Sequence, residues 1–180
     1  MSSWSKIARR VRVPLGFAFA AFYLWLARPA WISIIAGSAI VILGLVVRAL
    51  ASGHVRKNQE LTTTGPYGYT RNPLYLGSLI LACGFALAGW NWWIAGAMVL
   101  MFAVIYVPVI RGEEAFLRQQ FPEFEEYASA VPRIVPRLQP WKKSQIAFSR
   151  DLYFQHREYQ ALLGALAMVT ALIVRMIVIK

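Results

Sequence analysis

Apolar residues are gathered into five long runs along this chain, and polar residues into the segments between them. A helix that crosses a bilayer needs about 20 mostly apolar residues. The runs that approach or reach this length cover residues 13–27, 29–47, 74–90, 92–110 and 159–179. This pattern predicts an all-α, polytopic membrane protein with about five transmembrane helices.

The third and fourth runs are separated by a single polar residue, Asn91, which predicts a tight helical hairpin. The surrounding sequence, GWNWW, places three tryptophans at the turn, and tryptophan is enriched where a membrane meets water. At the other end of the hairpin, Pro73 suits the first position of a helix, with Asn72 as its N-cap. We therefore expect the third helix to begin at Pro73 and an interfacial turn at Asn91.

Composition supports the membrane assignment. The hydrophobic fraction is 58%, above the roughly 45–50% that is usual in soluble domains, and only 15% of the residues are charged. A chain of 180 residues has the length of one domain. We expect a single integral-membrane domain over residues 1–180, with a motif-bearing core at residues 48–138 and an extra C-terminal span at 159–179.

Charged residues lie almost entirely on one side of the expected membrane. Sixteen of the 19 Lys and Arg residues, and all eight acidic residues, fall in the N-terminal segment or in the connections after the second and fourth runs. The positive-inside rule makes this side cytoplasmic, so we expect a cytoplasmic N-terminus in a multi-pass membrane protein. The net charge of +11 favours anionic lipid headgroups as neighbours, and no separate basic domain exists for nucleic acid.

The interiors of the expected spans contain almost no ionisable residues, which argues against a transport path. Chemistry is therefore expected in the two polar segments that follow the second and fourth runs. In the first of them, the start of the third helix can bind an anion. In the second, the Glu113–Glu114 pair is costly beside anionic lipid unless it meets a cation. That cation is either Arg71 or Arg111 in an ion pair, or a bound ligand.

A series of motifs runs through these polar segments in a fixed order. They are Gly65-Pro66-Tyr67, Arg71-Asn72-Pro73-Leu74-Tyr75-Leu76-Gly77, the hairpin, Glu113-Glu114, Phe121 with Tyr127, and Val131-Pro132-Arg133. The series resembles the isoprenylcysteine carboxyl methyltransferase family and its phospholipid methyltransferase relatives, which carry a Gly-x-Tyr turn, Arg-His-Pro-x-Tyr-x-Gly, a Glu-Glu pair and a Val-Pro turn. This chain departs from the family at Asn72, where histidine is most common.

The resemblance implies a membrane-embedded methyltransferase that uses S-adenosylmethionine as its cofactor and has no Rossmann domain. Its acceptor would be lipophilic and methylated at the cytoplasmic interface, and a prenylated cysteine carboxylate, a lipid amine and a small thiol or acid all remain open. Glu113 would bind the amino group or ribose of the cofactor, Arg71 would bind its carboxylate, and tyrosine rings would face its adenine or sulfonium. The cofactor-binding positions implied are Leu61, Thr62, Tyr67, Arg71, Asn72, Pro73, Tyr75, Glu113 and Glu114.

Two residues are candidates for catalysis. His54, in the first polar segment, could act as a general base for an amine or thiol acceptor. Arg111 stands two residues before Glu113, near the place where carboxylate-methylating members of the family use an arginine. We interpret His156 as structural, and no metal site is expected.

Two other functions fit parts of the sequence. Membrane sterol reductases have a similar Arg-x-Pro-x-Tyr turn and Val-Pro ending but bind NADPH, so an NADPH-dependent membrane reductase is the alternative enzyme. A non-enzymatic scaffold is the third hypothesis, and it does not explain the motifs in the two polar segments. Binding of S-adenosylmethionine rather than NADPH distinguishes the first hypothesis from the others.

Overall fold

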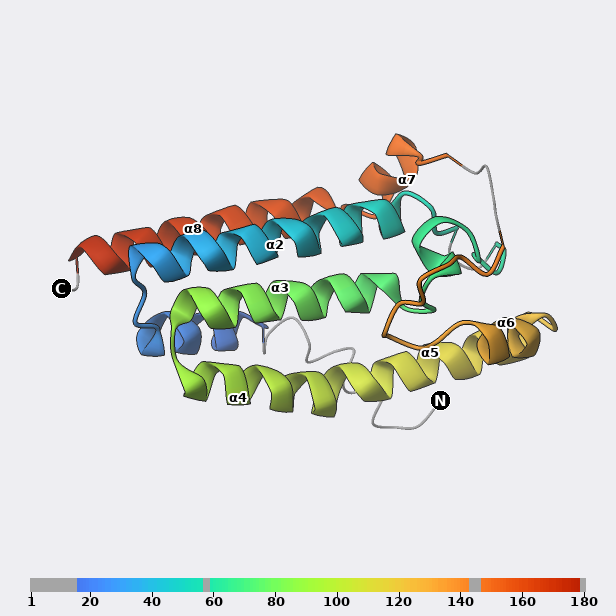
Figure 1. Cartoon of the computed structure of the whole chain (residues 1–180), viewed down its shortest axis with the longest axis horizontal. Coiled ribbons are helices and arrows are strands. Elements are labelled where there is room, and N and C mark those ends of the chain that lie inside the picture. The colour runs from blue at the N-terminus through green and yellow to red at the C-terminus, as the bar shows by residue number, and fades with distance from the viewer. Residues whose placement is uncertain (1–15, 57–58, 143–146, 179–180) are drawn as a thin grey trace.

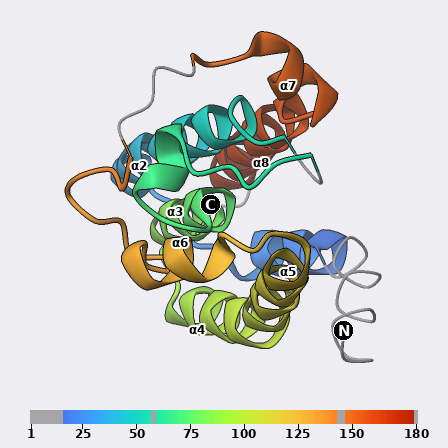
Figure 2. The ribbon, with the colours of Figure 1, turned by 90° about the vertical axis from the view of Figure 1, so that its right-hand side faces the viewer.

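A computed structural model of the protein describes residues 16–56, 59–142 and 147–178. Within these residues the chain forms helices and loops but no strand, which confirms the all-α prediction. The long helices lie side by side in an elongated bundle (Figure 1). Viewed along the bundle, α3 lies between α2 and α8 on one side and α4 and α5 on the other (Figure 2).

The bundle contains the N-terminal helix Gly16–Leu26, α2 (Trp31–Ser52), α3 (Pro73–Gly89), α4 (Trp92–Met101), the π-helical turn η2 (Phe102–Tyr106), α5 (Val107–Gln120) and α8 (Tyr159–Val178). The shorter elements are the 3-10 turn η1 (Gly65–Gly68), α6 (Phe124–Ala130) and α7 (Arg150–Gln155).

Three of the described helices are long and apolar enough to cross a membrane. They are α2, the continuous helix Trp92–Gln120 and α8. The N-terminal helix and α3 are apolar but shorter. Residues 13–15 of the first expected span lie outside the described residues. Three of the five predicted spans are thus supported by their length, and the total of five stays a prediction.

Helices α2 and α3 pack backbone to backbone along two pairs of glycines. A Cβ added at Gly37 of α2 would lie 2.5 Å from the Gly84 carbonyl oxygen of α3, and one at Gly44 would lie 2.9 Å from the Gly77 carbonyl oxygen. Small residues allow this close approach, which gives van der Waals packing where lipid supplies no hydrophobic driving force. The antiparallel pair fixes the end of α2 beside the start of α3, where the polar segments meet.

Gly37→Ala is expected to destabilise the protein by about 1–3 kcal/mol, because the new methyl group overlaps the α3 backbone and the helices must separate. Gly96→Ala is the matched control, since a Cβ at Gly96 of α4 meets nothing within 4 Å. Thermal unfolding of both variants in detergent measures the difference. Equal unfolding temperatures for the two variants would contradict the close packing of α2 and α3.

The connection between α3 and α4 is the tight turn expected at Asn91. Trp90 ends α3 in a left-handed backbone conformation, with φ of 48°. The Asn91 side chain caps α4 by accepting a hydrogen bond of 2.9 Å from the Trp93 backbone N–H. Its Nδ2 also donates to the Leu26 carbonyl oxygen at 2.9 Å. One side chain therefore joins the hairpin to the end of the N-terminal helix.

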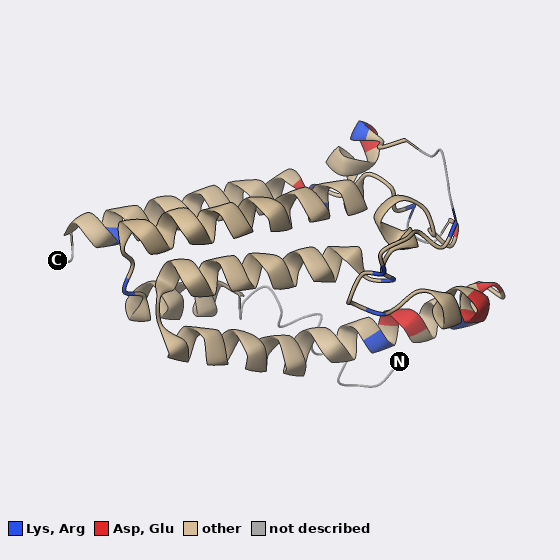
Figure 3. Ribbon diagram, in the orientation of Figure 1, with Lys and Arg blue, Asp and Glu red and all other residues tan. Residues whose placement is uncertain are grey.

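Most charged residues of the described segments gather at the other end of the bundle (Figure 3). The helix Trp92–Gln120 reaches that end through η2, which lies immediately before Pro108 in α5. Proline has no backbone N–H for a helical hydrogen bond, and a π turn is a common local adjustment within a helix. Beyond the turn, α5 carries Glu113 and Glu114 to the charged end.

Candidate active site

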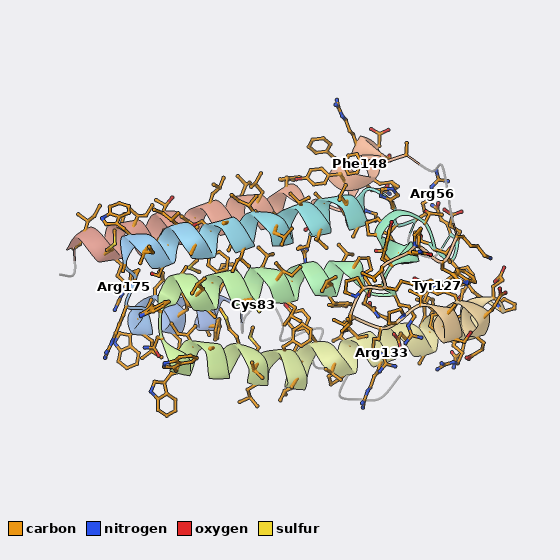
Figure 4. All side chains as sticks on the ribbon, in the orientation of Figure 1. Arg56, Cys83, Tyr127, Arg133, Phe148 and Arg175 are labelled. Carbon is orange, nitrogen blue, oxygen red and sulfur yellow. The ribbon has the colours of Figure 1, made fainter. Side chains whose placement is uncertain are left out.

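The charged end of the bundle contains a cavity of about 870 Å³, which we call the polar cavity. Its walls come from the end of α2, the loop before α3, the first turns of α3, the region from η2 to α6, and the turn between α7 and α8. The volume falls in the range of about 300–1,000 Å³ that is typical of small-molecule sites. Arg56 and Tyr127, two of its lining residues, lie at this end of the bundle, far from Arg175 (Figure 4).

The fold brings most of the predicted cofactor-binding residues together around this cavity. Those that line it are Leu61, Thr62, Tyr67, Arg71, Asn72, Tyr75, Glu113 and Glu114. Pro73 is buried at the first position of α3, next to the wall but not part of its lining. The grouping of residues from both polar segments agrees with the expected arrangement, while their binding roles stay predictions.

The two predicted catalytic residues do not line the polar cavity. His54 follows the end of α2, where its Nδ1 lies 2.7 Å from the Leu50 carbonyl oxygen. Its ring makes an edge contact with Phe148, with 6.4 Å between ring centroids. Arg111 is exposed on α5. Their proposed catalytic roles therefore have no support from the geometry.

Glu114 is a buried carboxylate that holds the site together. Arg133 donates to it through Nε at 3.0 and 3.1 Å and through Nη2 at 2.7 Å. The Arg71 Nε lies 3.5 Å from the same carboxylate, so the ion pair with Arg71 is confirmed. The hydrogen bond to Glu114 raises the pKa of Arg133 above its usual value. Because two arginines surround it, Glu114 ties α5 to the start of α3 and to the turn after α6.

Asn72 belongs to the same network. It occupies the N-cap position of α3 as predicted, but its side chain does not cap the helix. Instead its Nδ2 donates to Glu114 Oε1 and to the Arg133 carbonyl oxygen, both at 3.1 Å. Both partners are acceptors, so the position requires a group with two N–H donors, which an amide supplies without a change of protonation. This explains how asparagine can make the required hydrogen bonds at a position where the family most often has histidine.

Glu113 also lines the polar cavity, but unlike Glu114 it pairs with no cationic side chain among residues 16–56, 59–142 and 147–178. It accepts a hydrogen bond of 3.0 Å from the Tyr75 hydroxyl. The Tyr75 ring in turn contacts Tyr106 edge to face, with 5.8 Å between centroids. A carboxylate held in this way is a candidate ligand for a cationic group.

The ionised side chains that line the cavity carry one net negative charge. They comprise three arginines and four glutamates: Arg48, Arg56, Arg71, Glu60, Glu113, Glu114 and Glu158. Every glutamate in this set except Glu113 has an arginine partner. Arg133 lies outside the lining and also pairs with Glu114, which leaves Glu113 as the carboxylate where a cationic group is best placed.

Two tyrosines form an uncharged wall of the cavity. Tyr67 is buried, and burial raises the pKa of its hydroxyl, with Tyr127 and Glu113 raising it further. Burial likewise raises the pKa of Tyr127, whose hydroxyl donates to the Tyr67 carbonyl oxygen at 2.7 Å. Both phenols stay protonated near neutral pH. They can offer aromatic surface and hydrogen bonds to a ligand but cannot act as bases there.

Several residues that line the cavity were not predicted as site residues from the sequence, among them Arg48, Ser78, Tyr106 and Glu158, and His156, which was interpreted as structural. Arg48 near the end of α2 pairs with Glu158 before α8 through bonds of 2.5 and 3.0 Å, and it donates to Ser78 of α3 at 2.6 Å. The signal in the sequence is an arginine near the end of one apolar run and a glutamate immediately before another, on the same expected side of the membrane.

Three of the described helices are long and apolar enough to cross a membrane, and the charged cavity lies at one end of the bundle. These features indicate an integral membrane protein. Residues 38–123 match the family described as phospholipid methyltransferase. The resemblance to integral-membrane methyltransferases is therefore confirmed over this segment, which contains the Arg-Asn-Pro motif, the hairpin and the Glu-Glu pair. The match does not favour the alternative of an NADPH-dependent reductase.

Two curated relatives share one stretch with this chain. The nickel-cobalt-cadmium resistance protein NccN of Alcaligenes xylosoxydans xylosoxydans is 41% identical over 83 residues, which is 46% of this chain and 39% of that protein. The cobalt-zinc-cadmium resistance protein CzcN of Cupriavidus metallidurans is 42% identical over 83 residues, covering 46% and 38%. The aligned stretch thus covers about two-fifths of each relative. No solved structure matches the chain.

Proposed function

We propose that this protein transfers a methyl group from S-adenosylmethionine to a lipophilic acceptor at the cytoplasmic face of the membrane. The family match over residues 38–123 supports membrane methyltransferase activity. When bound, S-adenosylmethionine supplies a methyl group activated by a sulfonium. The acceptor reaches the cavity from the bilayer between the helices, and the cytoplasmic orientation follows from the distribution of lysine and arginine.

The observation that carries this proposal is the uncompensated carboxylate of Glu113 in the polar cavity. S-adenosylmethionine has a sulfonium, an ammonium and a carboxylate, and therefore one net positive charge. Among the glutamates of the lining, Glu113 alone has no arginine partner within the described residues. Charge complementarity of this kind favours the cofactor over NADPH, which is strongly anionic.

The residues of the cavity can be matched to the parts of the cofactor. Glu113 binds the α-amino group, and Tyr75 orients Glu113 through their hydrogen bond of 3.0 Å. Arg71 is assigned to the carboxylate, because its buried Nε has no hydrogen-bond partner among the described residues. The rings of Tyr67 and Tyr106 supply aromatic surface for the adenine or the sulfonium.

The names of the two relatives refer to resistance to metals, but the proposed activity does not include metal binding by this chain. Within the described residues, no group of three or more His, Cys, Asp or Glu side chains is placed to hold a metal ion.

S-adenosylhomocysteine is expected to bind the purified protein in detergent at a one-to-one ratio, because it keeps the ammonium and carboxylate of the cofactor. Isothermal titration calorimetry measures this binding, with NADPH titrated in parallel. Binding of NADPH without binding of S-adenosylhomocysteine would reject the methyltransferase proposal in favour of a reductase. Incubating the protein with lipid extracts and labelled S-adenosylmethionine then identifies the acceptor.

A further inference from the structure

His156 lines the polar cavity from outside the family-matched segment. It lies in the turn between α7 and α8, where its Nδ1 is 3.2 Å from the Ser52 carbonyl oxygen of α2. A carbonyl oxygen only accepts hydrogen bonds, so this contact assigns the proton of the neutral ring to Nδ1. The other nitrogen, Nε2, then carries a free lone pair. A histidine anchored in this way is equipped to accept a proton.

The backbone around His156 holds the ring in place. Arg157 has a φ of 53°, a left-handed conformation that is unfavourable for a residue with a Cβ. This bend allows His156 and Glu158, two residues apart, both to line the cavity, while Arg157 is exposed. Glu158 is fixed by its bidentate pair with Arg48 of α2. Strain of this kind is often retained at functional sites.

The charged groups near His156 are largely compensated. Arg48 neutralises Glu158, and Arg56 lies 3.7 Å from Glu60 in a half-exposed pair at the edge of the same cavity. Arg157 beside it in the chain is exposed to solvent. His156 therefore lines a cavity in which the neighbouring charged groups are already matched.

We infer that His156 is the general base that removes a proton from the methyl acceptor, an inference that rests on the proposed methyltransferase function. The Nε2 lone pair takes the proton from the acceptor atom, whose own lone pair forms the new bond to the methyl carbon. The bond between sulfur and that carbon breaks, its electrons remain on sulfur, and the proton on His156 passes to water. The acceptor is thus an amine, thiol or hydroxyl group, because a carboxylate has no proton to lose at neutral pH.

Chemical modification tests the position of Nε2 without an activity assay. The chain has two histidines, and each places Nδ1 against a backbone carbonyl oxygen, but only His156 lines the polar cavity. Diethylpyrocarbonate reacts with an unprotonated imidazole nitrogen. S-adenosylhomocysteine is expected to slow modification of His156 at least about tenfold and to leave modification of His54 unchanged, as measured by peptide mass spectrometry. Equal protection of the two histidines, or protection of His54 alone, overturns the inference.

Methyl transfer to simple probes tests the base itself. His156→Asn keeps an N–H donor near the position of Nδ1 and lacks Nε2. With 1-dodecanethiol and dodecylamine as acceptors, this variant is expected to bind S-adenosylhomocysteine as the wild type does and to lose about 10²–10⁴-fold in rate. The rate on the thiol recovers at alkaline pH, where the thiol ionises without a base. His54→Asn is the competing variant, because His54 is the candidate base that the sequence predicts.

The outcomes separate this inference from the proposed function. Failure of the wild type to bind S-adenosylhomocysteine rejects the proposed function before any variant is made. If the wild type binds it but His156→Asn does not, the residue supports binding and is not the base. Wild-type transfer to dodecanoate alone, or loss of rate in His54→Asn but not in His156→Asn, also overturns the inference.

Discussion

Glu113→Gln is expected to raise the dissociation constant for S-adenosylhomocysteine by about 10- to 100-fold. The glutamine has nearly the shape of glutamate and can still accept the hydrogen bond from the Tyr75 hydroxyl. It loses the negative charge that pairs with the α-amino group, and a hydrogen bond to a charged group contributes about 1.5–3 kcal/mol. Calorimetry in detergent measures the change in affinity, and thermal unfolding of the same sample shows whether the fold is retained.

Glu125→Gln is the matched control for this prediction. Glu125 is exposed on α6 and pairs with Arg118, and neither residue lines the polar cavity. The substitution removes the same negative charge from the charged end of the bundle. It therefore controls for any change in the long-range electrostatic potential at the cavity. Affinity that is unchanged in Glu113→Gln, or reduced equally in both variants, would show that Glu113 does not bind the amino group.

Glu114→Ala is expected to destabilise the protein by about 3–5 kcal/mol, the usual cost of removing one partner from a buried ion pair. The Glu114 side chain is only 5% exposed, and Arg71 and Arg133 both lie within ion-pair distance of it. Its removal leaves two guanidinium groups and the amide of Asn72 without their shared acceptor. For a chain of this size the loss corresponds to a fall of roughly 6–20 °C in unfolding temperature.

Glu125→Ala provides the comparison for Glu114→Ala. Its carboxylate also pairs with an arginine, but the Glu125 and Arg118 side chains are 65% and 52% exposed. An exposed ion pair contributes about 0–1 kcal/mol, so this variant should unfold within a few degrees of the wild type. Both variants are measured by thermal unfolding in the same detergent. Similar losses in the two variants would mean that burial of the Glu114 network does not stabilise the site.

These two predictions differ although Glu113 and Glu114 are adjacent, and the reason is their position on α5. Successive residues of a helix point about 100° apart, so one carboxylate meets the Tyr75 hydroxyl while the other meets Arg71 and Arg133. The sequence identified the pair, with Arg71, Arg111 or a ligand cation as its partner. It could not assign the partners individually, because the rotation of α5 about its axis depends on packing and on the π turn before Pro108.

The hydrophobic pattern was sufficient to predict the helices and the hairpin. Long apolar runs must be helical in a bilayer because each backbone polar group needs an internal partner there. The turn at Asn91 followed from the one polar residue between two such runs, and Pro73 correctly marked the start of α3. The order of the short motifs was also sufficient to predict the family that residues 38–123 match.

Tertiary structure alone decided which distant residues complete the polar cavity. Arg48 and Glu158 are separated by 110 positions, and His156 meets Ser52 across a similar interval. These contacts form because α2 and α3 pack through glycines and because the bend at Arg157 directs the chain into α8. Apolar periodicity carries information about which residues form a helix. The pairing of polar side chains between helices depends on axial rotation and helix spacing, which the packing of the whole bundle determines.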